Sequence, residues 1–373
     1  MTEIDVSLMR GGTSKGVFMA LSDLPVDFDM RDTFALRLMG SPDPMQIDGL
    51  GGTHSSTSKI VAVESRPRDH GVEIAYLFAQ VGVERPVVDW GGNCGNLTAA
   101  VGPFAMYEGL VTADDPVVEI ALLNLNTNRR VTAHVPTAHG RPAVEGEFAI
   151  AGVPGTGAPI KLDWHDPGGS VNGHVLPTRS PLDVLTTSWG DVAVSIVDVS
   201  GPYVFVEASQ FGLRGVEGSA ALNEDRGLLT KLRELRALGA QLLGLASAAT
   251  ADAESPAIPR VAVVGRPLDF VAASGTAVAI EEYDIAARAL SMGRVHHAFP
   301  GTGLLCLAAA CNISGTIPSM LTRVASDRVR IGHNKGVTSV EAHVTDGEAG
   351  VRVASASTFR TARRLLRGTA FID

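Results

Sequence analysis

The sequence has few cysteines, few aromatic residues and no excess of positive charge. Its 373 residues include three cysteines, Cys94, Cys306 and Cys311, which are too few for a disulfide framework and form no C-x-x-C pair. The ten histidines form neither an H-x-x-x-H nor an H-E-x-x-H pattern, so we expect no metal site. The formal net charge of −9 argues against a nucleic-acid partner, because phosphate binding depends on clustered lysine and arginine.

Long apolar runs are also absent. None approaches the ~20 residues that span a bilayer, and residues 1–6 lack the basic and apolar regions of a signal peptide. We therefore expect a cytoplasmic protein with no membrane partner.

The composition is typical of a packed globular chain. Apolar residues make up 45% and charged residues 19%, which predicts a folded core rather than disorder. The length favours two domains, and 41 glycines with 5% aromatic residues favour a turn-rich β architecture. The stretch 140–180 is rich in glycine, proline and aspartate and is the candidate junction. We expect an N-terminal domain over 1–180 and a C-terminal domain over 181–373, whose last strands could return to the first domain.

Periodicity predicts several strands and one small-residue helix in each half, an internal repeat of architecture. The predicted strands cover 4–9, 58–63, 72–81, 117–123 and 130–135, then 192–197, 204–207, 260–264, 324–331, 338–344 and 351–355. The predicted helices cover 31–39, 94–107, 223–247, 285–291 and 302–311, and 248–259 reads as a surface loop.

The two small-residue helices differ at their first residues. Aligning Cys94-Gly95-Asn96 with Pro300-Gly301-Thr302 places a proline opposite the cysteine. A helix start exposes backbone N–H groups, which favour an anion and lower the pKa of a thiol. If the halves are related, a site with two thiols has become a site with one.

Four polar, glycine-containing segments could hold a small di- or tricarboxylate without a metal or a cofactor. The spacing of 11–16 is not that of a P-loop, and 301–303 lacks the last glycine of a dinucleotide fingerprint. Each segment alone is typical of an ordinary polar turn, but together they offer cations, hydroxyls and helix-start amides. The candidate binding residues in them are Arg10, Gly12, Thr13, Ser14, Lys15, Ser56, Thr57, Ser58, Asn93, Gly95, Asn96, Thr302 and Gly303.

Two residues are candidates for proton transfer. Lys59 begins an apolar strand pattern, where a lysine either extends its amine to water or keeps a partly buried amine. A buried amine near Arg10 or Lys15 would have a lowered pKa and could act as a base. Cys94 is either a small buried residue or a thiol tuned by the helix start. Cys306 and Cys311 lie in a leucine- and alanine-rich helix, where packing is their expected role.

Several multi-residue motifs occur in the same order along this chain as in a known family, and together they indicate a resemblance to it. Dense matches lie at 9–18, 40–44, 46–49, 51–53, 55–59, 76–78, 80–81 and 89–105, and looser ones at 194–198, 202–206, 288–293, 296 and 302–303. These stretches resemble the PrpF-like isomerases, a family that contains 2-methylaconitate isomerase, 4-oxalomesaconate tautomerase and aconitate Δ-isomerase. Gly201 replaces an asparagine that the family pattern has, and His333-Asn334-Lys335-Gly336 departs from the usual His-Pro-Ser-Gly.

The resemblance implies an α/β (α+β) fold like that of diaminopimelate epimerase. Such a fold has two pseudo-symmetric halves, each with a central helix wrapped by mainly antiparallel sheet, and an active-site cleft between them. Its epimerases use one cysteine from each half on opposite faces of the substrate. With Pro300 in the second position, the resemblance excludes that mechanism here and assigns the base to Lys59.

The implied activity is cofactor-independent allylic proton transfer, which moves or isomerises a double bond in an unsaturated tricarboxylate such as 2-methylaconitate or aconitate. Cys94 would donate the returning proton or only bind substrate, and Met292 and His333 join the binding residues. The alternatives are an oxalomesaconate tautomerase, an amino-acid epimerase and a non-catalytic carboxylate-binding protein. The family also suggests a homodimer.

Overall fold

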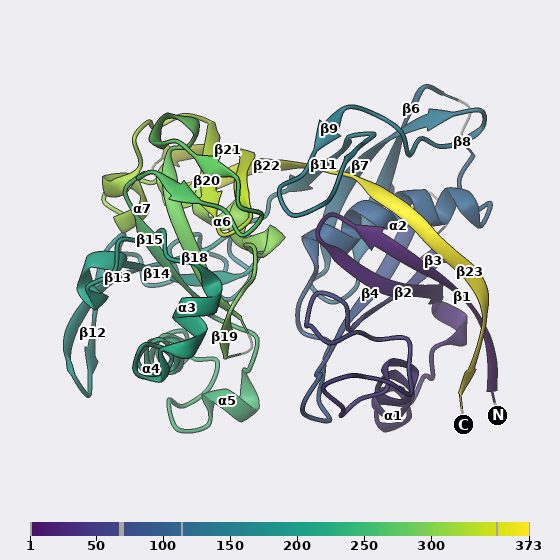
Figure 1. Ribbon diagram of the computed structural model, residues 1–373, viewed down its shortest axis with the longest axis horizontal. Coiled ribbons are helices and arrows are strands. Elements are labelled where there is room, and N and C mark those ends of the chain that lie inside the picture. Colours follow the sequence, from purple (N-terminus) through teal and green to yellow (C-terminus); the bar gives the residue numbers. More distant parts are fainter. Residues whose placement is uncertain (1, 67–70, 113–114, 292, 348–349, 373) are drawn as a thin grey trace. The chain divides into compact units, whose positions relative to one another are not determined.

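The computed structural model describes residues 2–66, 71–112, 115–291, 293–347 and 350–372. The chain divides into two compact units, 1–165 with 359–373 (unit 1) and 166–358 (unit 2). The first break lies within the stretch 140–180. The last strand belongs to unit 1 because β23 (Ala362–Ile372) pairs along the whole of β1 (Thr2–Gly11), as the yellow and purple strands of Figure 1 show.

Unit 1 is built on one mixed sheet. Its strands follow in the order β1, β2 (Ser14–Ala20), β3 (Lys59–Ser65), β4 (Ile74–Val81), β6 (Val117–Asn124), β7 (Arg129–Ala138) and β11 (Ile160–His165). The successive pairings are antiparallel, parallel, antiparallel, parallel, antiparallel and antiparallel.

Unit 2 repeats this scheme. Its strands are β13 (Gly190–Asp198), β14 (Pro202–Glu207), β15 (Arg260–Gly265), β18 (Ile285–Ser291), β20 (Arg328–His333), β21 (Gly336–Gly347) and β22 (Gly350–Arg360). They pair in the same six senses in the same order, and β12 (Asp183–Thr187) adds to β13. The expected internal repeat is therefore present.

A buried helix stands at the same place in each repeat. α2 (Gly95–Tyr107) lies between β4 and β6 in the chain, and α6 (Gly301–Cys311) lies between β18 and β20. α6 is buried over its whole length, and α2 over all but its last residue. Small residues let the strands and the helix approach each other closely. A Cβ added to Gly16 of β2 would lie 2.8 Å from the Leu97 side chain of α2.

The remaining elements lie around these repeats. The other helices are α1 (Phe28–Met39), α3 (Ser219–Glu224), α4 (Arg226–Leu242), α5 (Ala251–Glu254) and α7 (Ile317–Leu321). The short strands are β5 (Val88–Asp89), β8 (Arg141–Pro142), β9 (Phe148–Ala149), β10 (Thr156–Gly157), β16 (Phe270–Val271), β17 (Ala277–Val278) and β19 (Arg294–Val295). Within the described ranges, no helix is both long enough and apolar enough to span a bilayer.

One helix prediction is wrong, and another has the wrong bounds. Residues 285–291 form β18, which pairs with β15 on one side and β20 on the other and is almost wholly buried. A short apolar run buried on both faces has no alternation that would separate strand from helix. The predicted helix 223–247 is interrupted at Asp225, whose carboxylate accepts a hydrogen bond from the Leu228 N–H at 2.9 Å and begins α4 there.

The unit 1 sheet has two distinct faces. Val17 and Met19 pack with Phe34 and Leu38 of α1, whereas Phe18 points the opposite way, with its ring 5.5 Å from that of Phe104 in α2. Because neighbouring residues of a strand face opposite sides, Ser14 and Gly16 share the α2 face. This alternation decides which polar residues can meet.

Candidate active site

Lys59 is the first residue of β3 and is 8% exposed. Its Nζ donates a hydrogen bond to Oε1 of Gln80, the residue directly opposite on β4, and lies 5.1 Å from the centre of the Phe78 ring. The ring face attracts a cation, and the amide oxygen accepts an N–H group. The amine is therefore enclosed rather than extended into water.

The orientation of the Gln80 amide is fixed by its surroundings. Its Nε2 donates to the backbone oxygens of Ser55 at 3.0 Å and Ser58 at 2.9 Å. Carbonyl oxygens only accept, so the amide nitrogen must face them and Oε1 must face Lys59. Gln80 thus ties the amine to the loop that carries the predicted hydroxyls.

The start of α2 is organised by Asn93, Tyr76 and Thr98. Cys94 is the N-cap, and its backbone N–H donates to Asn93 Oδ1 at 2.7 Å. Asn93 Nδ2 donates to the Tyr76 hydroxyl at 3.1 Å, which lies 3.0 Å from Thr98 Oγ1. Burial raises the pKa of Tyr76 well above its usual value, so this hydroxyl stays neutral. Asn93 therefore supports the helix start, and the half-buried Cys94 thiol lies with its Sγ 3.9 Å from Ser14 Oγ.

Asn96 joins three segments in the first turn of α2. Its Nδ2 donates to Thr13 Oγ1 at 3.0 Å and to Ser14 Oγ at 3.5 Å, and its Oδ1 accepts from Nε of Arg360 at 3.0 Å. Both hydroxyls are acceptors in these bonds, so their own protons are available to an anion. The side chain of Asn96 itself is fully occupied.

Gly12 is required by this packing. A Cβ there would lie 2.3 Å from Asn96 Oδ1, and its φ of +50° favours glycine. Gly95, the first residue of α2, is also buried.

Arg10 and Lys15 do not join this cluster. Lys15 alternates with Ser14 and Gly16 and so lies on the α1 face, as does Arg10, its direct partner across the hairpin. Arg10 Nη1 donates to the backbone oxygens of Gly12 at 3.1 Å and Thr361 at 2.9 Å. Burial and the neighbouring Arg363 lower the pKa of Arg10. These two hydrogen bonds of Arg10 stabilise the turn at Gly11 and Gly12.

The hydroxyls of the loop before β3 are engaged within the loop or just beyond it. Ser58 Oγ accepts from Gln46 Nε2 at 2.8 Å, and Thr57 Oγ1 donates to His54 O at 2.9 Å. Ser56 Oγ lies 3.1 Å from His54 Nδ1, which also accepts the Ser56 N–H. These residues hold the loop against Lys59 and Gln80.

In unit 2, Pro300 is the N-cap of α6, the position that Cys94 has in α2. Thr302 is 3% exposed, and a Cβ on Gly303 would lie 2.4 Å from the Tyr203 hydroxyl, so Gly303 is explained by packing. Met292 lies outside the described residues.

His333 ends β20 and is 2% exposed. Its Nδ1 accepts from the Lys335 N–H at 3.2 Å, and its Nε2 lies 2.9 Å from Thr338 Oγ1. These contacts stabilise the hairpin between β20 and β21.

The other two cysteines are wholly buried in α6. Burial raises the pKa of Cys306 well above its usual value and that of Cys311 to about 12. Both stay neutral thiols, as expected for packing residues.

Arg360 also joins the cluster around Asn96, although the sequence did not single it out as a site residue. It lies 264 positions from Asn96 in the chain, and only the fold brings the two together. Burial lowers the pKa of Arg360 to about 10, so the guanidinium remains charged near neutral pH.

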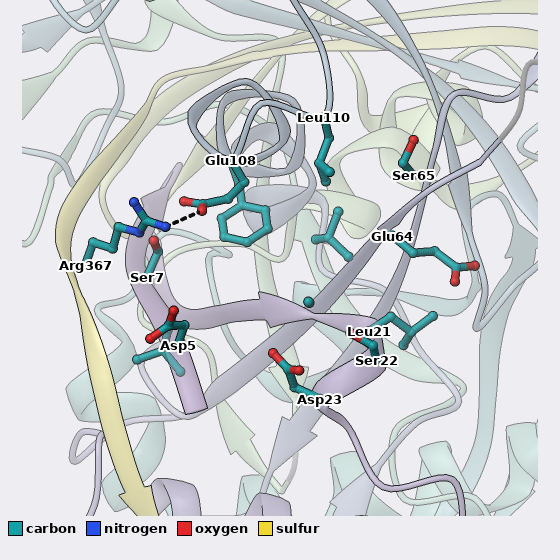
Figure 2. A pocket seen from close by; sticks show the side chains of 14 residues that line it. Asp5, Ser7, Leu21, Ser22, Asp23, Glu64, Ser65, Glu108, Leu110 and Arg367 are labelled. Atoms are coloured by element: carbon teal, nitrogen blue, oxygen red, sulfur yellow. Dashed lines mark ion pairs between the residues drawn. The ribbon is translucent and has the colours of Figure 1, made fainter. Parts of the chain in front are cut away.

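A cavity of about 590 Å³ lies at the other end of unit 1, beyond the last residues of β3 and the end of α2. Figure 2 shows the Glu108 carboxylate facing Arg367 there, with three further carboxylates in the lining. They belong to Asp5, Asp23 and Glu64. This concentration of negative charge disfavours a carboxylate ligand.

The model of the family described as "PrpF protein" matches residues 1–373. The chain belongs to the PrpF protein family. It is 41% identical to the 3-methylitaconate isomerase of Eubacterium barkeri and 38% identical to the 2-methyl-aconitate isomerase of Cupriavidus necator. Each alignment covers 98% of this chain and 96% of the relative. The predicted family and the isomerase class are therefore confirmed.

Solved structures agree with the expected fold. A methylitaconate-delta-isomerase superimposes with a TM-score of 0.80 at 40% identity, over 100% of this chain and 96% of that one. A hydroxyproline epimerase from Agrobacterium vitis does so with a TM-score of 0.59 at 12% identity, over 99% of this chain and 91% of that one. The second likeness concerns the fold alone, and together they confirm the epimerase-like architecture of this PrpF family member.

Proposed function

We propose that the chain catalyses allylic isomerisation of an unsaturated di- or tricarboxylate without a cofactor, with Lys59 as the base. The observation that carries the proposal is the enclosed Lys59 amine, held by the oriented Gln80 oxygen on the face of the sheet that also carries Ser14. One N–H is directed to Gln80, and the Phe78 ring covers another side. When the amine is neutral, its lone pair has a restricted set of directions, as a base needs.

The proton transfer balances without any further reactant. The Lys59 lone pair takes an allylic proton from carbon, and the C–H electron pair delocalises through the double bond into a carboxylate as a dienolate. A proton then returns to the other end of the allyl system and the double bond is displaced. Rotation in the delocalised intermediate would give cis–trans isomerisation instead.

Groups at the start of α2 suit the developing negative charge. The first backbone N–H groups of a helix have no partner within it, and the Thr13 and Ser14 hydroxyls have protons to donate. The returning proton comes either from the Lys59 ammonium or from the Cys94 thiol.

The substrate that we propose is 2-methylaconitate, aconitate or a close analogue. Relatives named for 3-methylitaconate and 2-methyl-aconitate are similarly close to this chain. A single methyl group supplies only about 1–3 kcal/mol of discrimination, so each acid requires its own assay. Screening methylaconitate, aconitate, methylitaconate and oxalomesaconate by ultraviolet absorbance and proton NMR identifies the preferred one. A homodimer is also proposed from the family resemblance, and light scattering of the purified protein measures its mass.

The test of the base is Lys59→Met with substrate in deuterated water. We expect turnover and deuterium incorporation to fall by about 10²–10⁴-fold, the usual contribution of a general base. Lys161→Met is the matched control, since Lys161 is another strand lysine, paired with Asp163. Exchange at the wild-type rate in Lys59→Met would show that another group is the base. Binding of an aconitate-like acid without deuterium incorporation by the wild type would favour a non-catalytic binder.

A further inference from the structure

Arg360 is a buried cation with an incomplete set of partners. It is 3% exposed, its Nε donates to Asn96 Oδ1, and its Nη1 donates to the Phe359 backbone oxygen at 2.7 Å. Within the described part of the chain, no carboxylate forms an ion pair with it and no acceptor takes a hydrogen bond from Nη2. Arginine is almost never so deeply buried unless it is paired.

A second buried arginine shows what a purely structural role looks like. Arg288 in unit 2 is 2% exposed, and burial lowers its pKa to about 10, as for Arg360. Its Nε donates to Glu217 O at 2.6 Å, its Nη1 to Ala287 O at 2.9 Å and its Nη2 to Val216 O at 2.8 Å. Every nitrogen of Arg288 is bonded to a backbone oxygen. The Nη2 N–H groups of Arg360 are open to an acceptor from outside the described residues.

The groups around Arg360 select an anion. Asn96 links the guanidinium to the Thr13 and Ser14 hydroxyls, whose protons face away from its amide. The first-turn amides of α2 add a positive end of the helix dipole. A planar guanidinium beside hydroxyl donors matches the geometry of a carboxylate.

We propose that Arg360 binds one carboxylate of the substrate through its Nη2 N–H groups, beside the hydroxyls of Thr13 and Ser14 at the start of α2. This inference deepens the proposed function and rests on it for the identity of the substrate. It gives Asn96 the role of a positioning residue, which holds the cation and the two hydroxyls in one arrangement.

The test uses saturated acids, which lack the allylic double bond and cannot be isomerised. Titration calorimetry with tricarballylate and methylsuccinate measures affinity separately from proton transfer. Arg360→Lys keeps the charge but replaces the three guanidinium nitrogens by one amine, and we expect its affinity to fall roughly 10–100-fold, as for a lost charge-assisted hydrogen bond. These acids have no allylic proton to transfer, so their affinity does not depend on which group is the base, and failure of the base assignment and failure of this inference are distinguishable.

Two further variants control for folding. Arg288→Lys should lower the unfolding temperature and leave the affinity unchanged, because each nitrogen of Arg288 donates to a backbone oxygen. Arg360→Ala should regain part of its affinity on addition of methylguanidinium, which a merely structural role would not produce. A folded Arg360→Lys with wild-type affinity would overturn the proposal.

Discussion

The starts of α2 and α6 have the same place in the two repeats but different chemistry. At α2, the N-cap is Cys94, and a neutral tyrosine, Tyr76, is held by Asn93 and Thr98. At α6, the N-cap is Pro300, and the Tyr203 hydroxyl, which lies near Thr302, makes no hydrogen bond of acceptable geometry within the described residues. One helix start presents a thiol and proton donors, and at the other Gly303 is packed closely against Tyr203.

The strands beside the helices differ in the same way. β3 begins with Lys59, and β15, its counterpart in unit 2, begins with Arg260, whose guanidinium lies 5.9 Å from the Tyr203 ring. An amine can accept a proton, whereas the guanidinium of a protein arginine only donates hydrogen bonds. Identical topology thus provides two equivalent places, and the residues that we propose for acid–base chemistry lie in the one that belongs to unit 1.

The largest effect expected inside this comparison is that of removing the thiol. Cys94→Ala should lower the turnover number by about 10²–10⁴-fold if the thiol returns the proton, because general acids contribute that much. Cys306→Ala is the control: Cys306 is buried in α6, and its Sγ lies 3.2 Å from Val197 O. We expect it to change stability and not turnover. Steady-state kinetics of both variants decide the point, and unchanged turnover in Cys94→Ala would give the returning proton to Lys59.

Gln80→Leu should produce the next largest effect. The change removes the oxygen that holds Lys59 and both bonds to the backbone of Ser55 and Ser58. Misplacement of a reacting group by about 1 Å costs roughly 10²-fold in rate, so we expect a fall of that size in the turnover number. The affinity for tricarballylate should change little, and a loss of affinity alone would show that Gln80 binds substrate.

A stability measurement tests the close packing of Gly303 against Tyr203 in unit 2. Gly303→Ala places a Cβ 2.4 Å from the Tyr203 hydroxyl and 2.6 Å from Cζ, and overpacking of this kind costs about 1–3 kcal/mol. Adding Tyr203→Phe removes the hydroxyl, for which the described residues offer no hydrogen bond of good geometry, and should recover part of that free energy. Urea unfolding of the single and double variants gives the coupling. An unstrained Gly303→Ala that has lost substrate affinity would instead assign Gly303 to the site.

The repeat and the two helix starts were predictable because they depend on local signals. Glycines before a small-residue helix mark α2 and α6, and alternation marks most strands. Register and long-range pairing were not predictable. The pairing of Lys59 with Gln80 depends on how β3 meets β4, and Arg360 reaches Asn96 only because β22 leads the chain back to unit 1.

The sheet face on which Arg10 and Lys15 lie had a signal in the sequence. Lys15, Val17 and Met19 alternate with Ser14, Gly16 and Phe18, which is the pattern of a strand with two different faces. Residues 10–15 were predicted to bind an anion as one segment, whereas the period of two places Arg10 and Lys15 on the opposite face from Ser14.

The smallest effect is expected at the acidic cavity of unit 1, which lies by the end of α2 and not by its start (Figure 2). Arg367→Ala removes an ion pair with Glu108 of 3.0 Å, in which the arginine side chain is 57% exposed. Exposed pairs contribute about 0.2–1 kcal/mol, and Arg364 still pairs with Glu108 at 3.0 Å, so the free energy of unfolding should fall by less than about 1 kcal/mol. Turnover and tricarballylate affinity should match the wild type. A fall in either would place substrate at this end of unit 1 and would remove the distinction between the start of α2 and the rest of the repeat.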